Sequence, residues 1–493
     1  MKNMKKMKRL VALALSVVMV LAMSVFAFAR EAQTFTITAP GTKHQYEIYQ
    51  IFTGDLSGST LSNVKWGANG TGTAGSAVDE AVLTELANID ANSSDSDKLA
   101  IIKKYAKLDT NPVATISNGN TYTAAAGYYL IKDKDNSVSG LDSYTTYIVK
   151  VVGDVTITPK AAVPSFEKKI KDNNDTDGTE TGWQDSADYD IGDQVPFKLE
   201  GTVASNYDAY KTYYFAFHDI EEAGLTFNSA SVKVSVDGKK ITTGYEVVTN
   251  PSDGCSFEVI FNDLKKIAEV KANSKVTVEY TSELNNNAVL GNQGNVNKGK
   301  LEFSNNPNQE QGGTPETGET PWDNVIVFTY QVVVNKRAES VDGDKLSGAE
   351  FTLEKKLKDG SKKTITVIKS DDGTSFTFKG LDDGKYILTE TQTPNEYNSI
   401  DPIEFTVNAD HTITWDGTNR TGVLTSLTGN QADGKITFAP KEDNSELVTN
   451  VVNKKGSTLP STGGIGTTIF YVVGAILMVG AAVLLITKRR AEN

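Results

Sequence analysis

Two apolar runs, one near each end, limit what this chain of 493 residues can fold into. The first, residues 10–28, follows five basic residues and closes on small residues, which is typical of a secretory signal peptide cleaved after Ala29. The second, residues 465–486, is long enough to cross a bilayer as a helix. The basic residues 488–490 behind it would keep that end in the cytoplasm. The segment that folds therefore lies between the two runs and is exported.

A short motif stands directly in front of the second apolar run, formed by Leu459, Pro460, Ser461, Thr462 and Gly463. Motif, apolar helix and basic tail in this order are similar to the cell-wall sorting signal of Gram-positive surface proteins. In that family a sortase cysteine cleaves between Thr and Gly, here Thr462 and Gly463, and passes the Thr acyl group to an amine. The alternative is an ordinary C-terminal membrane anchor that happens to follow this pentapeptide.

Charge and residue counts exclude several classes of function. The precursor has a net charge of −13 although both terminal segments are basic, so the exported segment is more acidic still. Such a surface argues against nucleic acid or anionic lipid as a partner. Cys255 is the single cysteine, which excludes an internal disulfide, and we expect it to be a small core residue. The three histidines are spread along the chain, and no catalytic or metal-ligand cluster stands out. We therefore expect no enzyme activity, no cofactor and no metal.

The length of the exported segment suggests three domains, and alternating apolar residues predict that they are mainly β. We place them at residues 30–162, 163–329 and 330–456, between a signal peptide at 1–29 and a sorting region at 457–493. Strand patterns in the first domain lie at 34–39, 46–52, 127–131 and 144–152, and helical spacing between them predicts a helical insertion. The Tyr-Gln-Ile-Phe run at 49–52 resembles the N-terminal domain of sortase-assembled pilins.

A lysine, Lys160, follows Pro159 at the boundary between the first and second domains. Val155, Ile157, Pro159 and Lys160 match in spacing a pilin motif whose lysine receives the next subunit. The aromatic residue before the proline of that motif is Thr158 here, and its upstream tryptophan is absent. The resemblance implies that Lys160 is the acyl acceptor, held by the fixed φ angle of the proline. The alternative is a solvated interdomain lysine.

Three strand patterns of the second domain each place a polar residue on an apolar face, because side chains alternate along a strand. Lys168 shares its face with Phe166 and Ile170, Asp219 with Phe215 and Phe217, and Asn297 with Leu301 and Phe303. This set resembles the self-forming Lys–Asn isopeptide bond of pilin and collagen-adhesin domains. The resemblance implies a bond from Lys168 to Asn297 with Asp219 as the catalytic acid. The alternative is a buried Lys–Asp ion pair beside a polar asparagine.

The third domain repeats the pattern. Lys336 shares a face with two valines of its strand, and Glu390 lies in a run that resembles the E-box of collagen-adhesin B-type domains. In the last strand, Asn453 shares a face with Val451, whereas Asn450 shares one with a charged residue. The resemblance implies a second bond from Lys336 to Asn453, assisted by Glu390. Asn450 remains the alternative acceptor.

A loop in the second domain partly resembles a calcium-binding loop. Asn173, Asp175, Asp177 and Gly178 have the expected spacing, but the twelfth position is Gln184 instead of Glu. We prefer to interpret it as a solvated acidic loop.

These resemblances cover nearly the whole chain and imply tandem immunoglobulin-like β-sandwich domains. They imply the backbone subunit of a covalently polymerised pilus that supports adhesion and is anchored to the cell wall. Its partners would be a pilin-type and a housekeeping sortase, identical subunits, minor pilins and peptidoglycan, with host surface ligands left open. The alternatives are a monomeric wall-anchored adhesin and a minor pilin at the tip or base.

Overall fold

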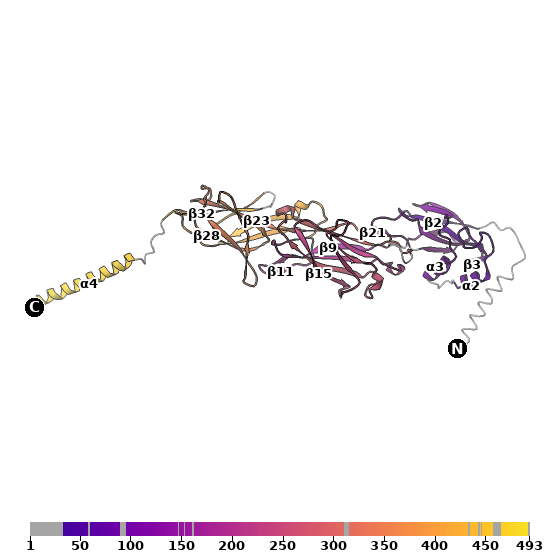
Figure 1. Cartoon of the computed structure of the whole chain (residues 1–493), viewed down its shortest axis with the longest axis horizontal. Coiled ribbons are helices and arrows are strands. Elements are labelled where there is room, and N and C mark those ends of the chain that lie inside the picture. The colour runs from indigo at the N-terminus through magenta and orange to yellow at the C-terminus, as the bar shows by residue number, and fades with distance from the viewer. Residues whose placement is uncertain are drawn as a thin grey trace, which may run out of the picture.

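The computed structural model describes residues 33–57, 60–88, 95–145, 147–151, 153–159, 162–309, 315–431, 434–441, 444, 446–456 and 465–491. The predicted signal peptide, Lys160 and the pentapeptide 459–463 lie outside these residues. The described chain forms three β-rich bodies in a row, followed by one separate helix (Figure 1). The predicted mainly β architecture with an α-helical insertion is confirmed.

The first body contains two small sheets and two helices. Its elements are β1 (Thr34–Thr38), β2 (Gln45–Ser57), β3 (Thr60–Trp66), α2 (Glu80–Leu86), α3 (Asp95–Lys103), β4 (Ala114–Ser117), β5 (Thr121–Ala125), β6 (Gly127–Asp133), β7 (Ile148–Val151) and β8 (Val155–Thr156). The sheets have the orders β5-β1-β8 and β3-β2-β6-β7, with β4 paired to β2. Strand β2 serves two cores, because Ile48 packs with β1 while Ile51 packs against the helices.

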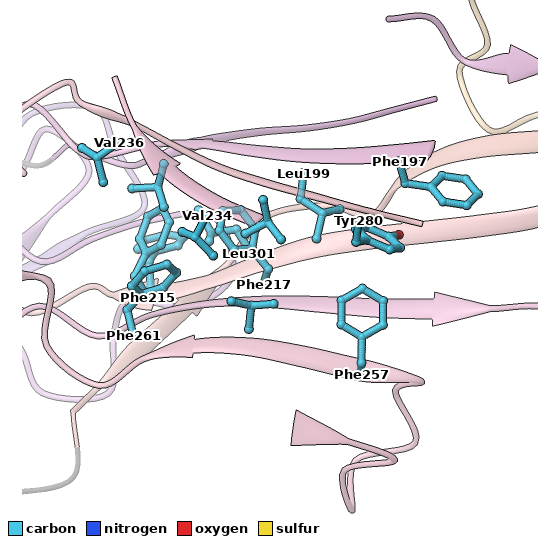
Figure 2. Packing of buried hydrophobic residues seen from close by; sticks show 14 of the residues in the cluster. Phe197, Leu199, Phe215, Phe217, Val234, Val236, Phe257, Phe261, Tyr280 and Leu301 are labelled. Atoms are coloured by element: carbon cyan, nitrogen blue, oxygen red, sulfur yellow. The ribbon is translucent and has the colours of Figure 1, made fainter. Parts of the chain in front are cut away.

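The second body is a sandwich of two sheets. Its elements are β9 (Ser165–Ile170), β10 (Asn173–Asn174), β11 (Thr179–Glu180), β12 (Ser186–Asp188), β13 (Gln194–Thr202), η1 (Tyr207–Ala209), β14 (Phe215–Glu221), β15 (Leu225–Val236), β16 (Lys239–Ile241), β17 (Glu246–Thr249), β18 (Phe257–Phe261), η2 (Leu264–Lys266), β19 (Lys275–Leu284), η3 (Gly291–Gln293), β20 (Asn295–Ser304), β21 (Thr317–Glu319) and β22 (Asp323–Phe328). One sheet has the order β16-β15-β19-β13-β9, and the other β12-β22-β20-β14-β18-β17, with β21 on β20. Aromatic side chains of both sheets, such as Phe197 and Phe217, meet in the core between them (Figure 2).

The third body is a second sandwich. Its elements are β23 (Tyr330–Ala338), β24 (Glu350–Lys356), β25 (Lys362–Ile365), β26 (Val367–Lys369), β27 (Ser375–Leu381), β28 (Gly384–Gln392), β29 (Ile403–His411), η4 (Arg420–Gly422), β30 (Leu424–Gln431), β31 (Phe438–Pro440) and β32 (Leu447–Asn453). The sheets have the orders β26-β27-β23-β32-β31 and β25-β24-β28-β29-β30. Strands β23 and β32, the first and the last, are parallel neighbours.

Strand β22 belongs to two cores at once. Val325 and Val327 pack in the core of the second body, whereas Ile326 and Phe328 pack in the core of the third. Alternation along one strand therefore joins the two bodies without a linker.

The first two bodies meet through backbone and amide hydrogen bonds. The Tyr144 amide donates to the Asn305 carbonyl at 2.7 Å, and Asn308 bonds the backbone of Thr145 and Tyr147, each at 2.9 Å. The segment 305–321 is polar and rich in Gly and Pro, a composition typical of a surface loop. In the structure, part of this segment pairs as β21 and part forms the junction.

The final helix, α4 (Ile465–Ala491), follows the sorting motif. Its window Tyr471–Lys488 has a mean hydropathy of 2.1 and is not buried by the rest of the described chain. It has the length and composition of a membrane-spanning helix.

Candidate isopeptide sites

The first candidate site lies in the core of the second body. Lys168, on β9, is fully buried, and its ammonium contacts the buried carboxylate of Asp219 on β14. The hydroxyl of Tyr280, on β19, lies 2.7 Å from Lys168 Nζ and donates to Asp219 Oδ2 at 2.8 Å. Strand alternation therefore brings the predicted lysine and acid together, as expected for inward side chains.

Asn297, on β20, is fully buried at the same place. Its Nδ2 donates to the Tyr280 hydroxyl at 2.9 Å and lies 3.3 Å from Glu221 Oε1. Two buried oxygens, Asp219 Oδ1 and Asn297 Oδ1, have no hydrogen-bond partner among the described residues. An unpaired buried acceptor is costly, so a proton shared at this place would be stabilising.

Burial governs the charges of the first site. It lowers the pKa of Lys168 and raises the pKa of Asp219. Burial and the neighbouring Asp219 together raise the pKa of Glu221 to about 8. Desolvation thus favours a neutral amine beside a protonated acid over an ion pair.

Sequence reasoning missed Tyr280 and Glu221. Tyr280 joins Lys168, Asp219 and Asn297 through a single hydroxyl. A signal for it existed, because it alternates with two buried valines, Val276 and Val278, on the inward face of β19.

The second candidate site lies in the third body. Lys336, on β23, is fully buried, and its Nζ contacts Asn453 Oδ1 on β32. Glu390, on β28, has a fully buried side chain with Oε1 2.9 Å from Lys336 Nζ. Its Oε2 accepts a hydrogen bond from Asn453 Nδ2 at 2.9 Å. Burial lowers the pKa of Lys336, although Glu390 opposes this.

Asn450 lies away from this site. It is only partly buried, and its Nδ2 donates to the Val341 carbonyl at 3.2 Å. Asn453 is the asparagine that reaches Lys336, in agreement with the preference drawn from strand faces.

The two sites differ in how they span the sandwich. Lys168 lies in one sheet, whereas Asp219 and Asn297 lie in the other, so the first site bridges the two layers. Lys336 and Asn453 lie on adjacent parallel strands of one sheet, and Glu390 reaches them from the opposite sheet.

The predicted acceptor Lys160 and the residues Leu459, Pro460, Ser461, Thr462 and Gly463 fall outside the described residues. The chain enters the acceptor region from β8, which pairs with β1, and Ile157 is buried behind it. It leaves at Ala162, whose carbonyl accepts a hydrogen bond from Ser143 Oγ at 2.9 Å. The acceptor region is therefore attached to folded elements on both sides.

The loop at 173–178 is not simply solvated. Asp175 contacts the ammonium of Lys355, a buried lysine on β24 of the third body. Lys355 also contacts Asp382 and lies 3.2 Å from Asp190 Oδ2. The expectation of a solvated acidic loop is corrected here, because the loop supplies an anion to an interdomain ion cluster.

Comparisons with known proteins recognise three segments. Residues 191–307 match the Gram-positive pilin backbone subunit 2 Cna-B-like domain, residues 331–421 match the prealbumin-like fold domain SpaA, and residues 451–493 match the LPXTG cell wall anchor motif.

Relatives of similar length were also found. The trypsin-resistant surface T6 protein of Streptococcus pyogenes serotype M6 is 29% identical over 443 residues, which covers 76% of this chain and 77% of the relative. The solved T6 backbone pilin of that serotype covers 87% of this chain and 100% of its own, at 19% identity and a TM-score of 0.52. The major pilin SpaD of Corynebacterium diphtheriae covers 88% and 99%, at 17% identity and a TM-score of 0.48.

The anchor motif, the apolar helix and the β bodies in front of it define a cell-wall-anchored surface protein of Gram-positive bacteria. The matched domains and the T6 relative narrow this class further. The chain carries a pilin-backbone domain and is similar over 76% of its length to the T6 protein, so its relatives are structural backbone pilins and not enzymes.

Proposed function

We propose that this backbone pilin polymerises covalently, with Thr462 of one subunit joined by a pilin-type sortase to Lys160 of the next. A housekeeping sortase then joins the fibre to peptidoglycan, and minor pilins and host surface ligands complete its adhesive role. Each subunit carries two self-formed bonds, Lys168 to Asn297 and Lys336 to Asn453.

The observation that carries the internal bonds is the second candidate site. A fully buried lysine, a fully buried carboxylate and a fully buried asparagine lie in mutual contact there. A buried Lys–Glu ion pair does not by itself require an asparagine in contact with both partners. Nucleophile, acid and carboxamide in one apolar place are the reactants of an amide exchange.

The reaction forms one bond and breaks one. The neutral lysine amine attacks the asparagine side-chain carbon, and the C–N bond to the amide nitrogen breaks. The acid hydrogen-bonds the developing oxyanion and carries a proton to the departing nitrogen, which leaves as ammonia. The pKa shifts of Lys168, Lys336 and Asp219 support this assignment, since burial favours their neutral forms.

The positions of the bonds suit a load-bearing fibre. The third-domain bond would join β23 to β32, which are the first and last strands of that domain. Tension applied between neighbouring subunits would then pass along a covalent path close to the sorting motif. The amide, unlike a disulfide, cannot be reduced.

Intact mass of the folded chain tests the internal bonds. Each bond releases one ammonia, so the mass should fall about 17 Da short of the sequence mass per bond, or about 34 Da in total. A mass equal to the sequence mass would contradict both bonds. The single variants Asn297→Ala and Asn453→Ala should each restore about half of the deficit.

A wall extract tests the joint between subunits. Lys160→Ala should abolish the ladder of covalent polymers on a denaturing gel, whereas Lys169→Ala should leave it intact. Loss of the ladder with retention of wall-anchored monomer is the expected result. Survival of the ladder would place the acceptor elsewhere, and a ladder absent from the unaltered chain would favour a monomeric adhesin.

A further inference from the structure

The single cysteine of the chain lies within a group of potential metal ligands outside the two bond-forming sites. His218 lies on β14, and Glu258 lies directly opposite it on β18. Asp253 and Cys255 lie in the turn that joins β17 to β18. One ligand atom from each of these four residues lies within 4.8 Å of all the others.

The distances between the donor atoms suit a small metal ion. His218 Nδ1 is 3.0 Å from Glu258 Oε1, 3.2 Å from Asp253 Oδ2 and 3.8 Å from Cys255 Sγ, and Sγ is 3.0 Å from Asp253 Oδ2. Bond lengths of about 2.0–2.3 Å around tetrahedral zinc give donor-to-donor edges of about 3.3–3.7 Å. These four distances lie within a few tenths of an ångström of such edges, and all donor atoms lie within 4.8 Å of one another.

A second, independent observation is the outer hydrogen bond of His218. Its other ring nitrogen, Nε2, lies 3.1 Å from Glu302 Oε2 on the neighbouring strand β20. Glu302 is held in turn by Thr317 Oγ1, which donates to Oε1 at 2.6 Å. Metal-binding histidines commonly donate their distal N–H to a carboxylate, which fixes the ring and leaves the other nitrogen for the metal.

The charges around His218 also favour a cation. Three carboxylates, those of Asp253, Glu258 and Glu302, lie within 3.2 Å of one imidazole. Lys300, which lies opposite His218 on β20, instead places its ammonium 2.6 Å from Glu319. One imidazolium therefore faces an excess of negative charge in a place where Cys255 and Glu258 are buried. Asp253 is exposed and offers a path for an ion to enter.

We propose that His218, Asp253, Cys255 and Glu258 bind a divalent transition metal of the zinc class. The ion replaces the protons now shared among the donors, so binding releases one proton from the Cys255 thiol and one from the His218 imidazolium. Because a thiol must lose its proton to bind a metal, binding at Cys255 should weaken as the pH falls. A set of one sulfur, one nitrogen and two carboxylates suits zinc, cobalt or nickel and disfavours calcium or magnesium, which prefer oxygen alone.

The metal would attach the hairpin β17–β18, at the edge of its sheet, to β14, the strand that carries Asp219. The turn beside Cys255 already bonds β14, since the Ser256 amide donates to the Asp219 carbonyl at 2.7 Å. Coordination by His218 and Cys255 adds a second attachment one residue away from Asp219. Metal binding thereby stabilises the second body without using its core.

Cobalt(II) tests the proposal on the full chain in detergent, because a cobalt–thiolate bond gives a charge-transfer absorption band. We expect one equivalent of cobalt to produce the band and one equivalent of zinc to abolish it. Cys255→Ser should remove the band and weaken zinc binding at least about 100-fold. The matched variant His44→Gln, which alters another histidine held between two aspartates, should leave both unchanged.

Glu302→Gln tests the outer hydrogen bond. It should keep the band but weaken zinc binding about 10–100-fold, as loss of such partners does. Zinc should also raise the midpoint of thermal unfolding of the unaltered chain and not that of Cys255→Ser. Zinc binding without the thiolate band, or binding that survives in Cys255→Ser, would overturn the proposal.

Discussion

Lys336 and Lys355 are both fully buried and lie in the same domain, but they have different partners and their pKa values shift in opposite directions. Lys336 meets one carboxylate and one carboxamide, from Glu390 and Asn453. Lys355 meets three carboxylates, and among the residues that the structure describes no carboxamide is found in contact with it. Burial lowers the pKa of Lys336, whereas at Lys355 the aspartates outweigh burial and raise the pKa.

If Lys336 forms the proposed bond, this difference implies that burial alone does not make a lysine reactive. Desolvation favours the neutral amine only where the surrounding anions are too few to repay the lost hydration. With three aspartates around it, Lys355 remains a cation and serves as a structural ion. The count of carboxylates and the presence of an amide therefore separate a nucleophile from a salt bridge.

Removal of the amide acceptor should have the largest effect. Asn453→Ala prevents the bond across the 117 residues that separate Lys336 from Asn453. In the chain-entropy treatment of disulfides, such a closed loop contributes about 5 kcal/mol to the free energy of unfolding. Denaturant unfolding should show this loss. Mass spectrometry should show a deficit from the variant's own sequence mass that is smaller by one ammonia than the deficit of the unaltered chain. Asn450→Ala is the matched control and should change neither quantity.

Removal of the structural cation should cost nearly as much free energy while leaving the mass deficit intact. Lys355→Met leaves Asp190 and Asp382 buried without their partner, and loss of one member of a buried ion pair costs about 3–5 kcal/mol. Lys356→Met, next along β24, breaks only a surface pair with Glu404 and should cost less than about 1 kcal/mol. A mass deficit smaller by one ammonia in Lys355→Met would show that Lys355 is itself a nucleophile.

His411, on β29 of the third body, lies against Asp172 and Asp188 of the second body and should make the interface between these two bodies sensitive to pH. Burial opposes the charge of His411, but Asp172 and Asp188 outweigh it and raise its pKa to about 10. A raised histidine pKa adds stability that is complete below the unfolded value of 6.5 and is lost as the pH rises towards 10.

Thermal unfolding across this range provides the measurement. We expect a loss of about 2–3 kcal/mol between pH 7 and pH 9, at 1.36 kcal/mol per pH unit. His411→Gln should be less stable at pH 7 and should lose less free energy of unfolding between pH 7 and pH 9, with Glu221, whose pKa is about 8, as a remaining group that titrates in this range. An equal slope in that variant would assign the pH dependence to other groups.

The smallest effect should come from Tyr280, which has no counterpart at Lys336. Tyr280→Phe removes the hydroxyl that joins Lys168, Asp219 and Asn297 but keeps the ring packing. A hydrogen bond between neutral groups contributes about 0.5–1.5 kcal/mol, so the isopeptide bond should form about 2- to 10-fold more slowly after refolding. Mass spectra taken over time would show the delay, and the final mass deficit should equal that of the unaltered chain.

Sequence alone located both lysine–acid–asparagine sets, because strand alternation decides which side chains point inward. Lys168 and Lys336 were found from their apolar neighbours on one face. The same signal is present at Lys355, which alternates with the buried Phe351 and Leu353. Its partner Asp190 comes from another domain, 165 residues earlier, so no local pattern could separate this lysine from a reactive one.

Other features depend on pairings that the local pattern does not contain. The group around Cys255 forms because β14, β18 and the turn at 250–256 meet in the folded sheet. The continuous apolar run at 325–328 is typical of a strand buried on both faces. It did not indicate that the second face would be covered by the next domain, and the predicted boundary at residue 329 falls at the end of this strand.

The shared strand β22 also sets an order of assembly. Chains fold from the amino end as they are synthesised, so β22 joins the second body before the strands of the third are complete. Ile326 and Phe328 then form an apolar stripe on the outer face of a finished sheet, on a strand already paired with β12 and β20. The core of the third domain packs against this stripe as it folds. Lys336 therefore meets Asn453 only after the second domain has folded.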